Sequence, residues 1–383
     1  MTKRSMFLSY GKQSIDEDDI EAVVETLRSP FLTQGPKVEE FEKSVAAYVG
    51  AKYAVAFSNG TAALHGACYA AGIGTGDEVI TTPLTFAATS NAVLYCGGTP
   101  VFADIDMQTY NIDPVEIRKN ITFKTKAIIP VDFTGQPVNI DEIMQIAEEH
   151  KLIVIEDGAH SFGASYKGRK VGSQAHMTMF SFHPVKPITT AEGGIITTNS
   201  KEYYEKLKLF CSHGITKTPY AVEQGEWYYE MTDLGFNYRM TDIQAALGVS
   251  QMNKIDNFIS RRRDIANIYD KALKEIPGVV VPQQLAETKS GWHLYMLQLD
   301  QTVLKKTRKE IFNEMRSCNI GVHVHYIPVY WHSYYKDLGY EKGLCPKAEE
   351  WYEQALTLPI FPGMTDEDVM DVVCTLKDRL RLK

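Results

Sequence analysis

The sequence lacks the features that mark several specialised classes of protein. Its six cysteines include no C-x-x-C pair, so their spacing predicts neither a disulfide framework nor a zinc site, and we expect no metal. No run of about 18 apolar residues occurs, although a membrane-spanning helix needs one. The apolar run near the N-terminus is too short for a signal peptide. We therefore expect a cytoplasmic protein with no membrane segment.

Basic charge is scarce relative to acidic charge. The 383 residues carry a formal net charge of −8, which disfavours nucleic acid or an anionic membrane as the main partner. Residues 261–263 (Arg-Arg-Arg) are the only basic cluster, and we interpret them as the solvated face of a helix. Hydrophobic residues make up 44% and charged residues 23%, which is ordinary for a globular protein. The length allows one large core and a second, smaller domain.

Short apolar runs alternate with helical patterns between residues 53 and 200. The expected strands cover residues 53–57, 78–81, 99–104, 126–131 and 152–157. This alternation predicts an α/β domain built on a parallel sheet. Residues 152–155 are apolar and are followed by Glu156 and Asp157. That pattern is typical of a buried parallel strand whose carboxyl end opens into a site.

The C-terminal part of the chain has a different pattern. Residues 241–244 (Thr-Asp-Ile-Gln) match a capping box and open a helical region that we expect to run to Ile276. Further strands are expected at 292–299 and 321–326, and further helices at 307–318 and from residue 365. We predict a large domain over residues 1–255, including an N-terminal arm, and a smaller α+β domain over residues 256–383.

Two glycine-containing turns carry different predictions. Residues 58–61 (Ser-Asn-Gly-Thr) join a strand directly to a helix, and free N–H groups at such a helix start can bind an anion. Plain N-capping by Ser58 or Thr61 would explain the same residues. Residues 72–77 (Gly-Ile-Gly-Thr-Gly-Asp) are similar to a dinucleotide fingerprint, but they follow a helix and precede a strand. They predict only a turn.

Lys186 occupies an unusual place between two apolar runs, residues 177–182 and 195–198. Pro187 follows it, and a Gly-Gly pair closes the loop. Either the ammonium reaches solvent along its flexible stem, or the amine sits in a site that lowers its pKa. Taken alone, the segment favours the solvated lysine.

The groups expected at the strand ends of the large domain together change that interpretation. They are the helix start at Gly60 and Thr61, the aromatic Phe86, the carboxylate Asp157 with His160 three residues later, and Lys186. Pyridoxal phosphate needs such a set, because its phosphate suits a helix N-terminus and its pyridine nitrogen a carboxylate. Its ring suits an aromatic face, and its aldehyde needs a lysine amine for a Schiff base. The combination predicts a pyridoxal phosphate site.

Several motifs then resemble one family. They are residues 58–64, 156–161, 181–194 and 237–239, together with residues 32–36 and 325–329. Over essentially the whole chain, they resemble the DegT/DnrJ/EryC1/StrS family of sugar aminotransferases. The resemblance implies the type I fold of aspartate aminotransferase, with a mostly parallel seven-stranded sheet. It also implies a homodimer with active sites at the subunit interface.

The resemblance assigns roles residue by residue. It implies that Lys186 is the Schiff-base lysine, that Asp157 pairs with the pyridinium, and that Phe86 stacks on the ring. His160 would lie near the other face of the ring or its 3-hydroxyl. Phosphate would be bound by Gly60, Thr61, Ala62 and Ser181, and by Asn237 from the second subunit. The substrate would contact His325, Tyr330 and Arg239.

Within the family, three segments look most like the pseudaminic-acid branch. They are residues 186–194, 132–137 and 325–330. That branch aminates C4 of a UDP-linked 4-keto-6-deoxy-N-acetylhexosamine with glutamate as amino donor. Tyr330 stands where many family members carry His, so the sugar contact at this position is left open.

Alternative functions remain at this point. Another sugar nucleotide, carrying dTDP or GDP or a keto group at C3, would suit the same motifs. A dehydratase shares the fold but would replace the lysine with His, and a non-catalytic regulator is disfavoured by the net charge and the complete cofactor set.

His323 and His325 alternate with Val322 and Val324, so we expect both imidazoles on one face of the strand at 321–326. They lack a third partner in sequence for a catalytic metal. Residues 227–229 (Trp-Tyr-Tyr) could pack at an interface or line the sugar pocket, and packing is the favoured interpretation.

Overall fold

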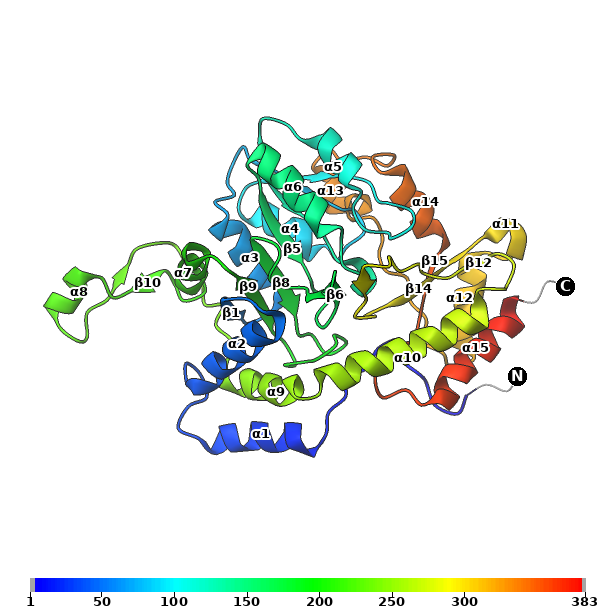
Figure 1. The fold of residues 1–383 in the computed structure, drawn as a ribbon, viewed down its shortest axis with the longest axis horizontal. Helices are drawn as coiled ribbons and strands as arrows, with labels where there is room; N and C mark the ends of the chain where they lie inside the picture. Colours follow the sequence, from blue (N-terminus) through cyan, green and yellow to red (C-terminus); the bar gives the residue numbers. More distant parts are fainter. Residues whose placement is uncertain (1–3, 381–383) are drawn as a thin grey trace.

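A central seven-stranded sheet organises the computed structural model, which describes residues 4–380 (Figure 1). Its strands are β1 (Tyr53–Phe57), β2 (Glu78–Thr81), β3 (Thr99–Phe102), β4 (Thr125–Ile129), β5 (Ile153–Asp157), β8 (Met177–Ser181) and β9 (Gly194–Thr198). They lie in the order β1-β9-β8-β5-β4-β2-β3. Strand β9 is antiparallel to both of its neighbours, and the other adjacent strands are parallel. The predicted α/β fold with a mostly parallel seven-stranded sheet is therefore confirmed.

Helices cover both faces of this sheet, because successive strand residues are buried on opposite sides. Helices α3 (Gly60–Ala70), α4 (Ala88–Tyr95) and α7 (Lys201–Phe210) pack on the face that holds Val55 and Ile155. The opposite face is covered by α2 (Pro36–Val49), α5 (Pro114–Asn120), α6 (Ile140–His150) and α9 (Asp242–Met252). Helix α1 (Glu17–Arg28) packs on α9. The sheet is thus the middle of three layers, and its strand ends are free to form a site.

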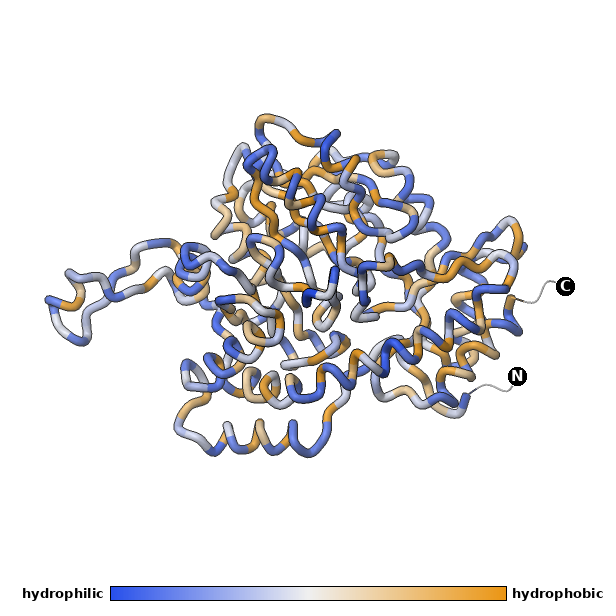
Figure 2. Tube along the Cα trace, in the orientation of Figure 1, coloured by the Kyte–Doolittle hydropathy of each residue, from blue (hydrophilic) through white to orange (hydrophobic). Residues whose placement is uncertain are grey.

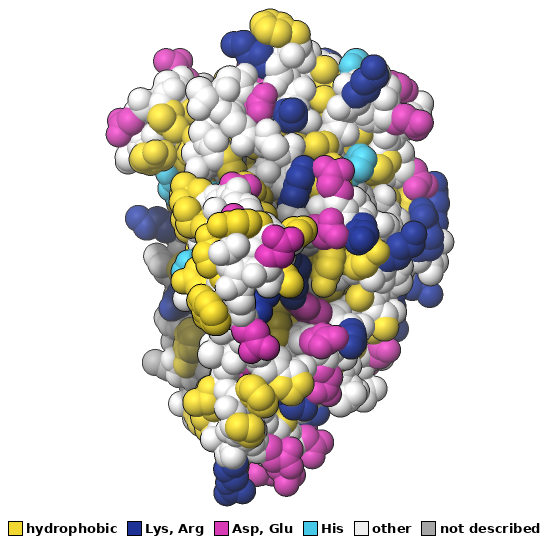
Figure 3. Space-filling view, turned by 90° about the vertical axis from the view of Figure 1, so that its left-hand side faces the viewer, with side chains coloured by type: hydrophobic (Ala, Val, Ile, Leu, Met, Phe, Trp, Pro, Cys, Tyr) yellow, Lys and Arg dark blue, Asp and Glu magenta, His cyan; other side chains and the backbone are white. Residues whose placement is uncertain are grey.

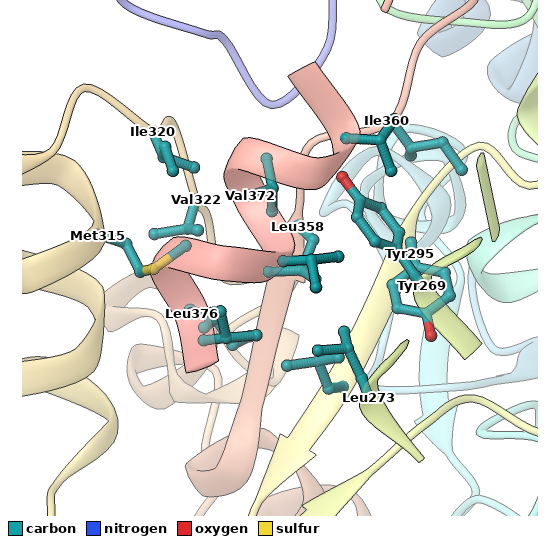
Figure 4. Packing of buried hydrophobic residues seen from close by; sticks show 14 of the residues in the cluster. Tyr269, Leu273, Tyr295, Met315, Ile320, Val322, Leu358, Ile360, Val372 and Leu376 are labelled. Carbon is teal, nitrogen blue, oxygen red and sulfur yellow. The ribbon is translucent and has the colours of Figure 1, made fainter. Parts of the chain in front are cut away.

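A second core lies beside the sheet. It is built from α10 (Ile255–Leu273), α12 (Arg308–Ser317), α15 (Asp366–Leu380), β14 (Tyr295–Leu299) and β15 (Ala355–Leu358). Figure 4 shows Leu273, Tyr295, Leu358 and Leu376 converging in this core, and Leu8 joins it from the N-terminal segment. The predicted boundary between residues 255 and 256 falls at the start of α10 and stays a prediction.

Shorter elements complete the structure. They are β6 (Ser165–Tyr166), β7 (Arg169–Lys170), β10 (Ile215–Thr216), α8 (Pro219–Gln224), β11 (Glu230–Met231), β12 (Val279–Val280), β13 (Thr288–Lys289), α11 (Gln301–Leu304), α13 (Ser333–Asp337) and α14 (Pro346–Gln354), with 3-10 turns at Phe133–Gly135 and Val329–Trp331. Strands β10 and β11 with α8 form an arm that projects far from the body (Figure 1). Among residues 4–380, no helix is both long and apolar enough to cross a membrane.

One prediction of regular structure is confirmed and another is wrong. The capping box at Thr241 is present, and the helical region that it opens consists of two helices, since α9 ends at Met252 and α10 runs from Ile255 to Leu273. The strand expected at residues 321–326 is absent, and His323 forms only an isolated bridge with Thr357. The backbone there divides its hydrogen bonds, since Gly321 N–H donates to Leu8 and His323 N–H to Thr357. Changing partners in this way prevents a continuous ladder.

Candidate active site

A cavity of about 860 Å³ lies at the carboxyl ends of β2, β5 and β8. The predicted residues that line it are Gly60, Thr61, Phe86, Asp157, His160, Ser181, Lys186 and His325. The loop after β2 carries Phe86, β5 ends at Asp157, and β8 ends at Ser181, shortly before Lys186. Parallel strands therefore bring together residues that are more than 120 positions apart in sequence, as their strand-end positions predict.

Lys186 extends into this cavity from the loop between β8 and β9. The residue is half-buried overall, while its Nζ lies 3.3 Å from Nε2 of His293. Burial lowers the pKa of Lys186 to about 8, Asp157 partly opposes that shift, and the charge of Arg262 adds to it. The site therefore increases the fraction of neutral amine, which is the form that attacks a carbonyl carbon.

Asp157 presents a fixed carboxylate to the cavity. Its Oδ2 accepts a hydrogen bond from Thr89 Oγ1 at 2.7 Å, and its Oδ1 accepts one from the Ala159 N–H at 3.1 Å. Burial raises the pKa of Asp157, whereas these hydrogen bonds and the charge of Lys186 lower it. A buried carboxylate with both oxygens oriented is suited to hold a protonated nitrogen.

The neighbouring acids do not share this role. Glu156 accepts a hydrogen bond from Thr178 Oγ1 at 2.9 Å, on the other side of β5, and burial raises its pKa well above the usual range. Asp132 is fully buried, accepts hydrogen bonds from Ser161 and from the Val138 N–H, and has a pKa raised by burial to about 7. These two carboxyl groups organise the strand ends beneath the cavity.

The start of α3 presents free N–H groups that could bind an anion, and we call it the α3 anion cradle. The residue that caps this helix is neither Ser58 nor Thr61. The cap is Asn59, whose Oδ1 accepts a hydrogen bond from the Ala62 N–H at 2.9 Å. The capping roles considered for Ser58 and Thr61 are therefore wrong, and the Ala62 N–H is already bonded. The N–H groups of Gly60 and Thr61, in the first turn, have no partner within the helix. A Cβ at residue 60 would lie 3.2 Å from Ser181 Cβ, so glycine allows the helix start and Ser181 to converge on one anion.

Two rings flank the cavity between these groups. Phe86 keeps 63% of its surface exposed and lies with its ring centroid 6.2 Å from that of Tyr326. His160 is buried, and its Nδ1 has no hydrogen-bond partner among the described residues. Burial, with the charge of Lys186, holds the pKa of His160 well below its usual range, so the ring is neutral. An exposed aromatic face and an orphaned imidazole nitrogen, added to the cradle, Asp157 and Lys186, fit pyridoxal phosphate.

The remaining wall contains polar rings. His325 Nδ1 lies 2.9 Å from Thr357 Oγ1, and the rings of His323 and His325 stack with centroids 4.4 Å apart. The two imidazoles thus lie side by side, although the strand that was expected to carry them is absent. Tyr10 lies 5.1 Å from the His325 ring, and Tyr326 completes the wall.

The structure places the other predicted site residues away from the cavity wall. Asn237 is exposed and forms a bridge with Ser212, whose hydroxyl accepts a hydrogen bond from Arg239 at 3.1 Å. Tyr330 is fully buried and donates to Glu349 at 2.6 Å. The expected contact between Tyr330 and the sugar is therefore corrected to a core role, in which the tyrosine fixes α14.

Sequence reasoning did not single out Tyr10 and His293 as site residues. The N-terminal segment brings Tyr10 in through a hydrogen bond from the Ile360 N–H to the Tyr10 carbonyl oxygen at 3.0 Å. His293 precedes β14 and reaches Lys186 across 107 residues of sequence. Only tertiary packing creates these contacts, since neither residue lies in a local motif.

Comparisons with known proteins agree with this geometry. The chain matches the model of the DegT/DnrJ/EryC1/StrS aminotransferase family over residues 13–377. It is 44% identical over 380 residues to the spore coat polysaccharide biosynthesis protein SpsC of Bacillus subtilis (strain 168), covering 98% of each chain. It is 39% identical over 372 residues to the UDP-4-amino-4,6-dideoxy-N-acetyl-beta-L-altrosamine transaminase of Campylobacter jejuni serotype O:23/36, covering 96% of each chain.

One solved structure adds a cofactor to the comparison. Spr1654 of Streptococcus pneumoniae, which has been put forward as a sugar aminotransferase, was solved in a PMP form. That form matches this fold with a TM-score of 0.92 and 32% identity, covering 98% of this chain and 99% of that chain. The same protein in its PLP form matches with a TM-score of 0.91 and 31% identity, covering 98% of each chain.

Proposed function

The chain belongs to the DegT/DnrJ/EryC1/StrS aminotransferase family, and on that premise we propose that it aminates C4 of a 4-keto nucleotide sugar with L-glutamate. The enzyme is a sugar aminotransferase that uses pyridoxal 5′-phosphate. The observation that carries this conclusion is the half-buried Lys186 in one cavity with Asp157 and the α3 anion cradle. The proposed substrate is UDP-2-acetamido-2,6-dideoxy-β-L-arabino-hexos-4-ulose, and the products are the 4-amino sugar nucleotide and 2-oxoglutarate.

Different residues of the cavity would hold different parts of the cofactor. Pyridoxal phosphate, when bound, supplies an aldehyde that condenses with amines and a ring that withdraws electrons. Gly60, Thr61 and Ser181 would bind its phosphate. Asp157 would hold the positive charge at the ring nitrogen, and Phe86 would cover one face of the ring. The position of each residue in the cavity wall supports its proposed role.

Lys186 would also carry the proton. With a pKa lowered to about 8 by burial, part of its population is a neutral amine near pH 7. Its Nζ can therefore take the proton from Cα of glutamate and later return a proton to C4 of the sugar. His293, 3.3 Å away, orients Nζ toward the cavity. Burial lowers the pKa of His293 well below its usual range, so this neighbour adds no charge.

Two relatives bear on the identity of the sugar. The Campylobacter jejuni transaminase, whose name gives UDP-4-amino-4,6-dideoxy-N-acetyl-altrosamine, supports a UDP-linked N-acetyl sugar aminated at C4. SpsC is the more similar of the two, and its name places it in spore coat polysaccharide synthesis. That relative supports a second candidate, the amination of a different keto sugar nucleotide. His323, His325 and Tyr10 supply the hydrogen-bonding groups in the wall that would select between the two sugars.

An assay with a panel of keto sugar nucleotides distinguishes the two candidates. With L-glutamate as donor, we expect the highest kcat/KM for the UDP-linked 4-keto-6-deoxy-N-acetyl sugar, with 2-oxoglutarate released in equal amount. NMR of the product should place the new amine at C4. A higher kcat/KM with a dTDP-linked or 3-keto sugar would overturn the substrate assignment, while no transamination of any panel member would contradict the sugar specificity altogether.

The arm supports a homodimer as part of the same proposal. It carries hydrophobic side chains in solvent, with Trp227 79% exposed, and Leu234, three residues after β11, is 73% exposed. Figure 3 looks toward the arm and shows hydrophobic side chains gathered on it, and Figure 2 shows hydrophobic segments along its trace. Contiguous exposed apolar surface of this kind is typical of an interface. A second copy packed here would also allow Asn237, at the base of the arm, to reach the cofactor phosphate of its partner.

The double variant Trp227→Asp, Leu234→Asp is expected to weaken dimerisation by at least about 100-fold, because it places charge on two apolar anchors. Sedimentation velocity across protein concentrations measures the change. Phe123→Asp is the matched control, since Phe123 is 95% exposed but lies between α5 and β4, away from the arm. The double variant, unlike Phe123→Asp, should also retain pyridoxal phosphate less well than the wild type. A wild-type protein that sediments as a monomer at micromolar concentration would refute the dimer.

A further inference from the structure

The three arginines at residues 261–263 do not form the solvated helix face that their sequence suggests. Arg261 and Arg263 are half-buried on α10, whereas Arg262 between them is 0% exposed. The earlier interpretation is therefore wrong for Arg262. Its position on α10 directs the guanidinium into the space between the sheet, the segment before β14 and the segment after β15.

Arg262 is bonded to backbone instead of to an acid. Its two Nη atoms donate to the carbonyl oxygens of four residues, which are Trp292 (3.2 Å), His293 (3.3 Å), Ile360 (2.9 Å) and Val185 (3.4 Å). Within residues 4–380, no carboxylate forms an ion pair with it. Burial accordingly lowers the pKa of Arg262 to about 9. A buried cation without a counter-ion is costly to the fold, and the contacts that Arg262 makes indicate what it does there.

Two of these carbonyls belong to the surroundings of the lysine. Val185 immediately precedes Lys186, and His293 lies 3.3 Å from Lys186 Nζ through its ring. Arg262 therefore bonds the backbone on each side of the Lys186–His293 contact. We propose that Arg262 is a positioning residue for Lys186, which holds the amine against His293 by fixing the Val185 and His293 carbonyls.

The charge of Arg262 supports the same role. Lys186 faces Asp157, which favours its protonated form, and Arg262, which opposes it. Three of the titratable rings that line the same cavity or contact Lys186, namely His160, His293 and His325, have pKa values held well below the usual range by burial and are neutral. Removal of Arg262 should therefore raise the pKa of Lys186. A guanidinium suits this task better than an ammonium, because its planar fork can bond several carbonyls at once.

The test uses the full-length chain freed of cofactor, so it does not depend on the substrate. Trace labelling with isotopic acetic anhydride at a series of pH values, read by mass spectrometry of the Lys186 peptide, gives the pKa and reactivity of this amine. Arg262→Met should raise that pKa by about one unit, which lowers the neutral fraction of the amine, and therefore its labelling, at pH 8 roughly fivefold. Arg262→Lys, which keeps the charge, should return the pKa of Lys186 most of the way to its wild-type value. An unchanged pKa in Arg262→Met would overturn the proposal.

Arg263→Met is the matched control, because Arg263 Nε also donates to a carbonyl, that of Ser290 at 3.1 Å. It should leave the pKa of Lys186 unchanged, and an equal shift in this variant would contradict a specific role for Arg262.

A double-mutant cycle tests the positioning role even if Arg262→Met fails to fold. If Arg262 acts through the His293 contact, Arg262→Gln combined with His293→Ala should alter Lys186 labelling no more than the stronger single variant does. Additive effects would overturn the proposed route through His293. The inference rests on the proposed role of Lys186, but the labelling result is independent of the sugar. A failed substrate panel together with a shifted Lys186 pKa would reject only the proposed substrate.

Discussion

Lys186→Ala is expected to abolish covalent attachment of the cofactor and to reduce turnover by at least about 10⁴-fold. The reason is that one amine performs two tasks in this cavity, bonding the cofactor and moving the proton. The other lysines among residues 4–380 lie outside the cavity wall, so none of them supplies a replacement amine there. Borohydride treatment followed by denaturation and mass spectrometry measures the covalent attachment, and release of 2-oxoglutarate measures turnover.

Lys186→Arg is the sharper comparison, because it keeps a positive charge but cannot attack an aldehyde. Both variants should still bind pyridoxal phosphate without a covalent bond, since the α3 cradle, Ser181 and Asp157 remain. We expect all three proteins to retain the cofactor, but only the wild type to attach it covalently. That result would distinguish the covalent role of the Lys186 amine from the non-covalent binding by the rest of the site. Turnover within tenfold of wild type in either variant would refute the assignment of Lys186.

The part of the site that the sequence predicted lies on regular, local patterns. The apolar run at 152–155 places Asp157 at the end of β5, and the two runs flanking Lys186 become the paired strands β8 and β9. Because carboxyl ends of parallel strands share one edge, strand assignment alone was enough to bring these residues together. The exact cap of α3 was harder, since Ser58, Asn59 and Thr61 are all good capping residues, and only the backbone geometry selects Asn59.

The rest of the site depends on packing between distant segments. Arg262 and His293 carry no local signal, because a triple arginine on a helix is normally solvated and a lone histidine before a strand is ordinary. Their roles arise where α10 crosses between the two cores and where the segment before β14 reaches the sheet. Tyr330 shows the reverse case, since its motif suggested a substrate contact and its surroundings bury it. The family resemblance identified the chemistry but could not provide these tertiary contacts.

Asp157→Asn is expected to lower kcat by about 10²- to 10³-fold, the range typical for loss of one preorganised charge in an active site. Asparagine can still accept the hydrogen bond from Thr89 and occupies nearly the same volume, so the cavity should keep its shape. It cannot, however, stabilise a positive charge at the ring nitrogen. The loss should therefore fall on kcat more than on KM. Steady-state kinetics with glutamate and the preferred sugar nucleotide give both constants.

The thermal stability of the cofactor-free Asp157→Asn protein distinguishes a loss of catalysis from damage to the fold. Burial raises the pKa of Asp157 in the folded protein above its unfolded value, so its contribution favours folding at low pH and is lost as pH rises through the folded pKa. The cofactor-free Asp157→Asn protein should consequently gain thermal stability relative to wild type, and the gain should grow as pH rises above the usual pKa of a carboxyl group. Glu156→Gln is the matched control, because Glu156 is the adjacent buried acid with a raised pKa but faces Thr178 instead of the cavity. It should show a similar gain in stability with nearly normal kcat. If Glu156→Gln loses activity as severely as Asp157→Asn, the effect belongs to the strand and not to a charge placed beside the cofactor.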